Sequence, residues 1–133
     1  MLAALDAALD QFDAEGGVAG RFARYSRNCA ILCGGMEELG FTPWLDEGVQ
    51  APIIVTFRIP DGGWFRFDDF YRSLHERGIV IYPGKLTAMD SFRIGCIGAI
   101  GEAEMRRALG VVGETVKAMG GPGRGSAGGS RKP

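Results

Sequence analysis

The stretch from Gly78 to Gly98, which reads GIVIYPGKLTAMDSFRIGCIG, constrains the fold more than any other part of the chain. It holds two apolar runs, 79–82 and 92–97, and Pro83-Gly84 closes the first of them. The connection between the runs is about eight residues long, a length that suits neighbouring antiparallel strands. We therefore predict an antiparallel pair of strands here.

Arg93 lies inside the second apolar run. Because side chains alternate between the two faces of a strand, Arg93 and Gly95 share one face, and Phe92 and Ile94 point to the other. Gly95 leaves open space beside the guanidinium, whose planar fork of donors fits a carboxylate or a phosphonate. The pattern is therefore typical of a site for a small anionic ligand.

Spacing alone also allows a structural role for Arg93. Buried charges are usually paired, and Asp69 or Asp90 could supply the partner. His75, late in a predicted helix, is interpreted as a surface or helix-end histidine, because no nucleophile pattern accompanies it. The residues by themselves thus leave the ligand and structural interpretations of Arg93 open.

Four segments have the apolar periodicity of helices. They cover residues 2–15, 18–39, 67–77 and 102–119, with breaks at Gly16-Gly17 and at Gly78. The second helix carries an apolar seam that should pack on the sheet or on another helix. The seam consists of Val18, Phe22, Tyr25, Cys29, Leu32, Met36 and Leu39. Between these positions lie Arg21, Arg24 and Arg27, which we predict to form a mostly exposed stripe.

Two further segments are typical of strands. Residues 53–59 have β-branched side chains on both faces and predict a central strand, which ends at a Pro-Asp-Gly-Gly turn. Residues 41–45, FTPWL, predict a short edge strand, where Pro43 is tolerated. The fold class that follows is α/β, a two-layer sandwich in which helices cover a small, mainly antiparallel sheet.

The domain organisation predicted is one small domain over residues 1–119, followed by a disordered Gly-rich tail over residues 120–133. The domain carries 12 basic and 16 acidic residues, a net charge of −4, which makes nucleic acid an unfavourable partner. Acidic residues interrupt the apolar N-terminal stretch, so neither a signal peptide nor a membrane-spanning helix is expected.

Cys29, Cys33 and Cys96 give neither an even count nor a CxxC pair, which indicates a reducing, cytoplasmic compartment and not a disulfide framework. A zinc site is not expected, because the chain has a single histidine far from these cysteines. Cys96 as a nucleophile has little support, since no base lies near it in sequence. The three thiols are interpreted as buried or half-buried core groups.

Four sequence runs carry a family resemblance. They are ARYSRNCAILCGGMEELGF at 23–41, FRFDDFYRSLHERG at 65–78, IYPGKLT at 81–87 and FRIGCIG at 92–98. Over residues 1–119 the chain resembles the C-terminal small domain of the 2-aminoethylphosphonate:pyruvate transaminases, which are class V, fold-type I aminotransferases using pyridoxal phosphate. The resemblance implies the fold of that domain and, for a complete enzyme, a homodimer.

The resemblance also implies a function. The family moves the amino group of 2-aminoethylphosphonate to pyruvate, giving phosphonoacetaldehyde and alanine, and the arginine of the FRIG motif binds the acidic group of the substrate. In this chain that residue is Arg93. Tyr82 and Lys85, in the neighbouring YPGK run, are further candidate substrate-binding residues. Lys85 does not match the Schiff-base lysine of the family, so no catalytic residue is expected in this chain.

The large cofactor-binding domain of the family has no counterpart in the chain, so we expect the chain alone to be inactive. Pyridoxal phosphate needs a lysine, an acid facing the pyridine nitrogen and donors around the phosphate. The chain offers no such set. Three alternatives remain: a fragment of a related alanine:glyoxylate or serine:pyruvate transaminase, a non-catalytic module that binds small acids, and an association module.

Overall fold

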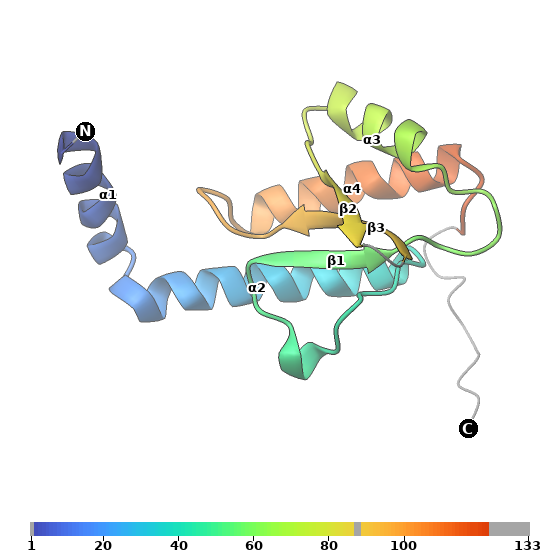
Figure 1. The fold of residues 1–133 in the computed structure, drawn as a ribbon. Coiled ribbons are helices and arrows are strands. Elements are labelled where there is room, and N and C mark those ends of the chain that lie inside the picture. Colours follow the sequence, from blue (N-terminus) through green and yellow to red (C-terminus); the bar gives the residue numbers. More distant parts are fainter. Residues whose placement is uncertain (1, 87–88, 123–133) are drawn as a thin grey trace.

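The computed structural model describes residues 2–86 and 89–122, without the side chains of residues 2, 84–86 and 89. Four helices and three strands follow in the order α1 (Leu2–Ala14), α2 (Gly17–Glu38), β1 (Ile54–Arg58), α3 (Phe67–Glu76), β2 (Tyr82–Leu86), β3 (Met89–Gly95) and α4 (Glu102–Ala118), with a short 3-10 helix at Glu47–Val49. Figure 1 shows α2 and α4 running alongside the small sheet, and α1 projecting away from it. The α/β fold with a small antiparallel sheet is confirmed.

The sheet has the order β1-β3-β2, and both pairings are antiparallel. The predicted hairpin is thus confirmed, but its boundaries were wrong. The first strand begins at Tyr82, and the ladder passes through Pro83 and Gly84 up to the Leu86–Met89 pair. A proline in an edge strand does not have to donate a ladder hydrogen bond, so Pro83 does not end the strand as predicted.

The central strand is β3 and not residues 53–59, which correspond to the outer strand β1. Beyond β1, the predicted edge strand at 41–45 is reduced to a single bridge between Pro43 and Phe57. Two backbone hydrogen bonds flank this bridge, from Trp44 N–H to the Thr56 carbonyl and from Arg58 N–H to the Thr42 carbonyl. Both bonds are made by the residues on either side of Pro43, so the bridge does not need an N–H at the proline.

One face of the sheet meets the helices and forms the core. Val55, Phe57, Phe92 and Ile94 are buried on this face, as the predicted alternation requires. Phe92 lies in the middle of an aromatic cluster that also contains Phe41, Phe57, Phe65 and Phe70, with ring centroids 5.5 to 5.7 Å from Phe92. The opposite face of the sheet is left open.

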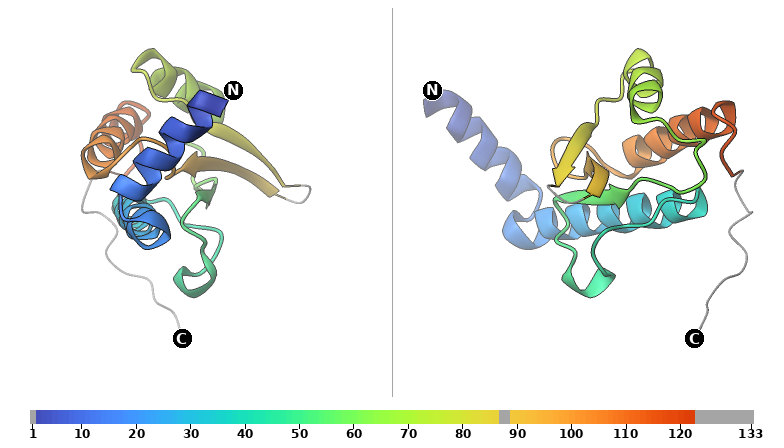
Figure 2. Two further views of the ribbon diagram at one scale, coloured as in Figure 1. Left: turned by 90° about the vertical axis from the view of Figure 1, so that its left-hand side faces the viewer. Right: turned by 45° about the vertical axis from the view of Figure 1, so that its right-hand side comes forward.

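The α2 seam is buried only in its C-terminal part. Cys29, Leu32, Met36 and Leu39 belong to the core, as predicted, whereas Val18 is 77% exposed and Phe22 is 61% exposed. The apolar periodicity predicted for residues 102–119 is confirmed in α4, where Met105, Leu109, Val112 and Val116 are buried. Figure 2 shows why the seam divides: the N-terminal end of α2 extends past the sheet to the elbow with α1.

The elbow between α1 and α2 lies at the predicted glycine pair. Gly16 and Gly17 both have positive φ, 96° and 65°, a region that glycine occupies without strain. The predicted exposed arginine stripe on α2 was wrong for two of its three members. Arg21 and Arg24 both form ion pairs with Glu15 at the elbow, and Arg27 alone remains exposed.

The predicted tail begins with three described residues, 120–122, and the remainder, residues 123–133, lies outside the described part of the chain. Gly121 N–H donates to the carbonyl of Val116, and a side chain at this position would meet Trp64. The chain after α4 therefore packs against Trp64.

Candidate functional site

Arg93 occupies the centre of the open face of the sheet. It lies on the middle strand, and its direct neighbours are Thr56 on β1 and Tyr82 on β2. Both Arg93 and Tyr82 are exposed, and Tyr82 keeps 57% of its surface accessible. The predicted alternation is confirmed, since Phe92 and Ile94 are buried on the other face. The guanidinium therefore faces out of the sheet and is accessible to a ligand.

Within the described residues, Arg93 makes neither a hydrogen bond nor an ion pair. Asp69, one of the two carboxylates considered as a structural partner, is bound by Arg66 and Arg72 on its own helix. Asp90, the other, pairs through its backbone with Lys85 in the hairpin. An arginine held in a strand without a protein partner has its full donor set available to an anion.

The space beside Arg93 is open, as predicted. A Cβ placed on Gly95 would meet no heavy atom within 4 Å. Tyr82 flanks Arg93 from the opposite strand, so the structure brings these two predicted site residues together. Lys85 is two ladder positions further along the hairpin from Pro83, and its side chain lies outside the described part of the structure.

A buried amide and an arginine hold the end of the Arg93 strand. Asn28 is 1% exposed, and its Nδ2 donates to the carbonyls of Cys96 and Ile100 at 3.1 Å each. Arg24 donates to the carbonyls of Gly98 and Ile100. These bonds satisfy carbonyls that leave the sheet after β3, and so fix the turn between Arg93 and α4. Sequence reasoning missed Asn28, although a polar side chain beside the apolar seam was a usable signal.

Two of the three cysteines, Cys33 and Cys96, are not activated. Burial is the main cause that raises the pKa of Cys33 and of Cys96 to about 12, and proximity to Cys29 adds to it in both cases. Cys29 and Cys33 line a cavity of about 560 Å³ between α2 and the loop at 42–52. The same cavity is lined by Glu37, Asp46 and Glu47. A thiol with so high a pKa remains protonated near neutral pH, so neither Cys33 nor Cys96 is a nucleophile.

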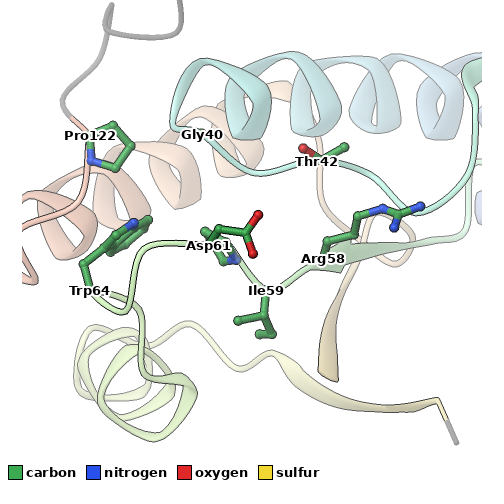
Figure 3. A pocket seen from close by; sticks show the side chains of 8 residues that line it. Gly40, Thr42, Arg58, Ile59, Asp61, Trp64 and Pro122 are labelled. Atoms are coloured by element: carbon green, nitrogen blue, oxygen red, sulfur yellow. The ribbon is translucent and has the colours of Figure 1, made fainter. Parts of the chain in front are cut away.

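A second, smaller cavity of about 250 Å³ lies at the end of β1 (Figure 3). Arg58, Asp61 and Trp64 line it, together with Thr42 and Pro122. Arg58 is exposed, and its guanidinium carbon lies 4.4 Å above the centroid of the Trp44 ring. Sequence reasoning missed Arg58 as a site residue. Arg58 is two residues from Thr56 on β1, so both lie on the sheet face that carries Arg93.

No group of three or more His, Cys, Asp or Glu side chains among the described residues could hold a metal ion. No helix in the described part of the chain is long and apolar enough to cross a membrane. His75 is exposed in the last turn of α3 and stacks on Tyr71, with centroids 5.9 Å apart, as expected for a helix-end histidine.

Solved structures of other proteins share the fold of this chain. No family model matches the chain. A pyridoxamine-pyruvate aminotransferase from Mesorhizobium loti shares the fold with a TM-score of 0.74 at 24% identity, over 89% of this chain and 30% of the other. A ureidoglycine-glyoxylate aminotransferase from Bacillus subtilis gives a TM-score of 0.73 at 20% identity, over 87% of this chain and 30% of the other. At these identities the likeness shows the fold alone.

Sequence relatives are much closer. A 2-aminoethylphosphonate–pyruvate transaminase from Paraburkholderia phymatum is 52% identical over 120 residues, which cover 90% of this chain and 32% of the relative. A transaminase of the same name from Burkholderia mallei has the same identity and coverage. The chain is homologous to part of the 2-aminoethylphosphonate–pyruvate transaminases.

The chain spans about a third of the length of these transaminases, 32% in both cases. The match extends over 120 residues, or 90% of this chain. The resemblance to this transaminase family and the α/β fold expected from the sequence are therefore confirmed.

Proposed function

We propose that this chain forms the substrate-anion wall of a transaminase that moves the amino group of 2-aminoethylphosphonate to pyruvate. The observation that carries the proposal is Arg93, which has no hydrogen-bond or ion-pair partner among the described residues and lies at the centre of an open sheet face, with clear space at Gly95. The identity of 52% to 2-aminoethylphosphonate–pyruvate transaminases supports the choice of reaction.

Arg93 would bind the phosphonate group through its planar fork of donors. Strand β3 is paired on both sides, so the arginine is presented by the most constrained strand of the sheet. Asn28 and Arg24 fix the turn that follows it. Such a rigid support restricts where the bound substrate can sit, which is what a transaminase needs to direct the amino group toward the reacting centre.

The described residues do not form a pyridoxal phosphate site. The lysine whose side chain is described, Lys117, is exposed near the end of α4 and lines neither of the two cavities described above. Pyridoxal phosphate supplies the chemistry of amino transfer when it is bound. We infer that cofactor binding depends on residues outside this chain. The same holds for formation of a homodimer.

A ligand titration of the purified chain tests the anion site. Adding 2-aminoethylphosphonate should shift the NMR signals of the Arg93 side chain and of the Thr56 and Gly95 amides in a saturable way. Arg93→Lys should lose these shifts, because an ammonium is a point charge that cannot reproduce the bidentate fork. Saturable shifts that persist in Arg93→Lys would remove Arg93 from the site.

The same substitution tests the reaction in a transaminase that includes this sequence. There, Arg93→Lys is expected to lower kcat/KM on the order of 100-fold, the cost typical of a misplaced substrate. Tyr82→Phe is a milder companion, which keeps the ring beside Arg93 and removes only the hydroxyl. An unchanged kcat/KM in Arg93→Lys would contradict the proposal.

The cofactor part is tested by absorbance. The purified chain, titrated with pyridoxal phosphate and then reduced with borohydride, should give no saturable Schiff-base band and no stoichiometrically modified lysine. A stoichiometric adduct on Lys85 would show that the chain binds the cofactor by itself.

A further inference from the structure

Two arginines that have no carboxylate partner among the described residues share the open face of the sheet. Six arginines of the described chain form ion pairs with carboxylates. Two of them share Glu15, two share Asp69, and the others pair with Glu102 and Glu114. By contrast, Arg27, Arg58 and Arg93 make no described hydrogen bond or ion pair. Arg27 lies on α2, so Arg58 and Arg93 are the two arginines of the sheet that have no such partner in the described part of the chain.

The ladder places these two arginines as diagonal neighbours. Arg58 pairs with Ser91, and Arg93 lies two residues further along the same strand. Diagonal neighbours in an antiparallel pair are about 7 to 8 Å apart and can be bridged by long side chains. A small anion above the sheet is therefore within reach of both guanidinium groups.

The Arg58 side chain is held only weakly in its observed conformation. Its guanidinium rests on Trp44, on the side of β1 that faces away from β3. An exposed cation–π contact is weak, so a ligand can replace it. Asp61 lines the same cavity as Arg58 but forms no ion pair with it, and Figure 3 shows the arginine side chain extending away from Asp61. No described carboxylate thus competes with a ligand for Arg58.

We propose that Arg58 is a second anion-binding residue of this site and that, together with Arg93, it makes the site prefer dianionic over monoanionic ligands. This inference rests on the proposed function, because it takes Arg93 as the primary anchor. Arg58 leaves the Trp44 ring and binds the second charge of a phosphonate. A carboxylate has one charge, which Arg93 alone satisfies, so Arg58 determines the class of acid that binds and not whether an acid binds.

Methylphosphonate and acetate test this preference on the complete purified chain, in mildly alkaline buffer where methylphosphonate is doubly charged. Affinities are measured by NMR titration, with the Trp44 indole N–H as a second readout. Arg58→Gln is expected to weaken methylphosphonate binding about fivefold, the upper range for an exposed charge pair, and to leave acetate binding unchanged. Arg58→Lys should retain part of the preference. Arg27→Gln is the matched control and should change neither affinity.

The outcomes separate this inference from the proposed function. If Arg58→Gln leaves methylphosphonate binding unchanged, or weakens both ligands equally, Arg58 has no role in selectivity and the inference is overturned. If methylphosphonate does not move the Trp44 indole signal, Arg58 does not leave the ring and the inference is likewise overturned. If the unmodified chain binds neither ligand, or Arg93→Lys binds both normally, the proposed function itself fails.

Discussion

At the scale of single residues, the ion pairs of Glu15 give the chain a pH-dependent contact. Hydrogen bonds from Arg24 and from Arg21 lower the pKa of Glu15 to about 2. Arg24 also donates to the carbonyls of Gly98 and Ile100, so the contact joins the α1–α2 elbow to the turn after β3. Protonation of one carboxyl would therefore loosen two distant parts of the chain together.

The sign of this effect predicts a loss of stability in acid. The folded pKa of Glu15 lies below its ordinary value of 4.5, so its contribution is fully present above pH 4.5 and is lost as the pH falls toward 2. Glu15→Gln should lower the free energy of unfolding at neutral pH, and the difference from the unmodified chain should shrink over this range. Urea unfolding at a series of pH values measures it.

Asp13→Asn is the matched control for Glu15. Asp13 is exposed and forms no ion pair in the described structure. Its substitution should leave the pH dependence unchanged. A Glu15→Gln variant whose stability difference stayed constant down to pH 2 would contradict the role given to the two arginines.

The sequence predicted the face of the strand on which Arg93 lies, but not the contacts of the residues around it. Period-two alternation is a local property, and it placed Arg93 and Gly95 correctly on one face. The contact of Arg58 with Trp44 depends on the pairing of residues 42–44 with β1, which is a long-range choice of register. Likewise, the buried bonds of Asn28 reach carbonyls 68 and 72 residues away, beyond any local pattern.

At the scale of elements, the interface of α2 with α4 relies on one glycine. A Cβ on Gly35 would come within 2.4 Å of Leu109 Cδ1, whereas a Cβ on the preceding Gly34 would meet nothing within 4 Å. Leu109 is 7% exposed and belongs to the core, so it has little space into which to move. The two neighbouring glycines of one helix thus differ in whether a methyl group fits.

Gly35→Ala is therefore expected to lower the free energy of unfolding by about 1 to 3 kcal/mol, the cost of overpacking a core. Gly34→Ala is the control, and it should raise the stability by up to about 1 kcal/mol, because alanine is the better helix former. Thermal or urea unfolding of both variants measures the difference. Equal stabilisation by both substitutions would show that α2 and α4 can separate without cost.

Element types were easier to predict than element positions. The helices at 2–15, 18–39, 67–77 and 102–119 match the observed ones to within one or two residues, because their periodicity is long and their breaks are glycines. The strands were less well defined. Residues 53–59 have apolar side chains on both faces and were predicted as central, yet pairing made β3 the central strand. An apolar pattern indicates that a strand is buried, but it does not show whether helices, loops or neighbouring strands cover it.

At the scale of the whole molecule, apolar side chains of α1 and of the start of α2 remain uncovered. Leu5, Leu9, Val18 and Phe22 are all more than half exposed. Figure 2 shows α1 pointing away from the sheet and from α4. Exposed apolar surface of this extent favours contact with another molecule. The structure places this surface around the elbow between α1 and α2.

We predict that the purified chain self-associates with increasing concentration. Replacing Val18 and Phe22 together by Ser should weaken this association, because their apolar area no longer gains from burial. Sedimentation velocity over a range of concentrations measures it. Val80→Ser is the control, since Val80 is 57% exposed but lies between α3 and β2. A chain that stays monomeric throughout, or an equal effect of Val80→Ser, would contradict the prediction.

Pro83 has a consequence for the outer border of the sheet. It occupies the second position of the edge strand β2, opposite Phe92. An edge strand offers a row of unpaired backbone groups on which another chain can add a strand, and proline removes one donor from that row. An incoming strand would thus meet an interrupted template. The proline that does not end β2 instead protects this border from growth into larger sheets, while the arginine face beside it stays open.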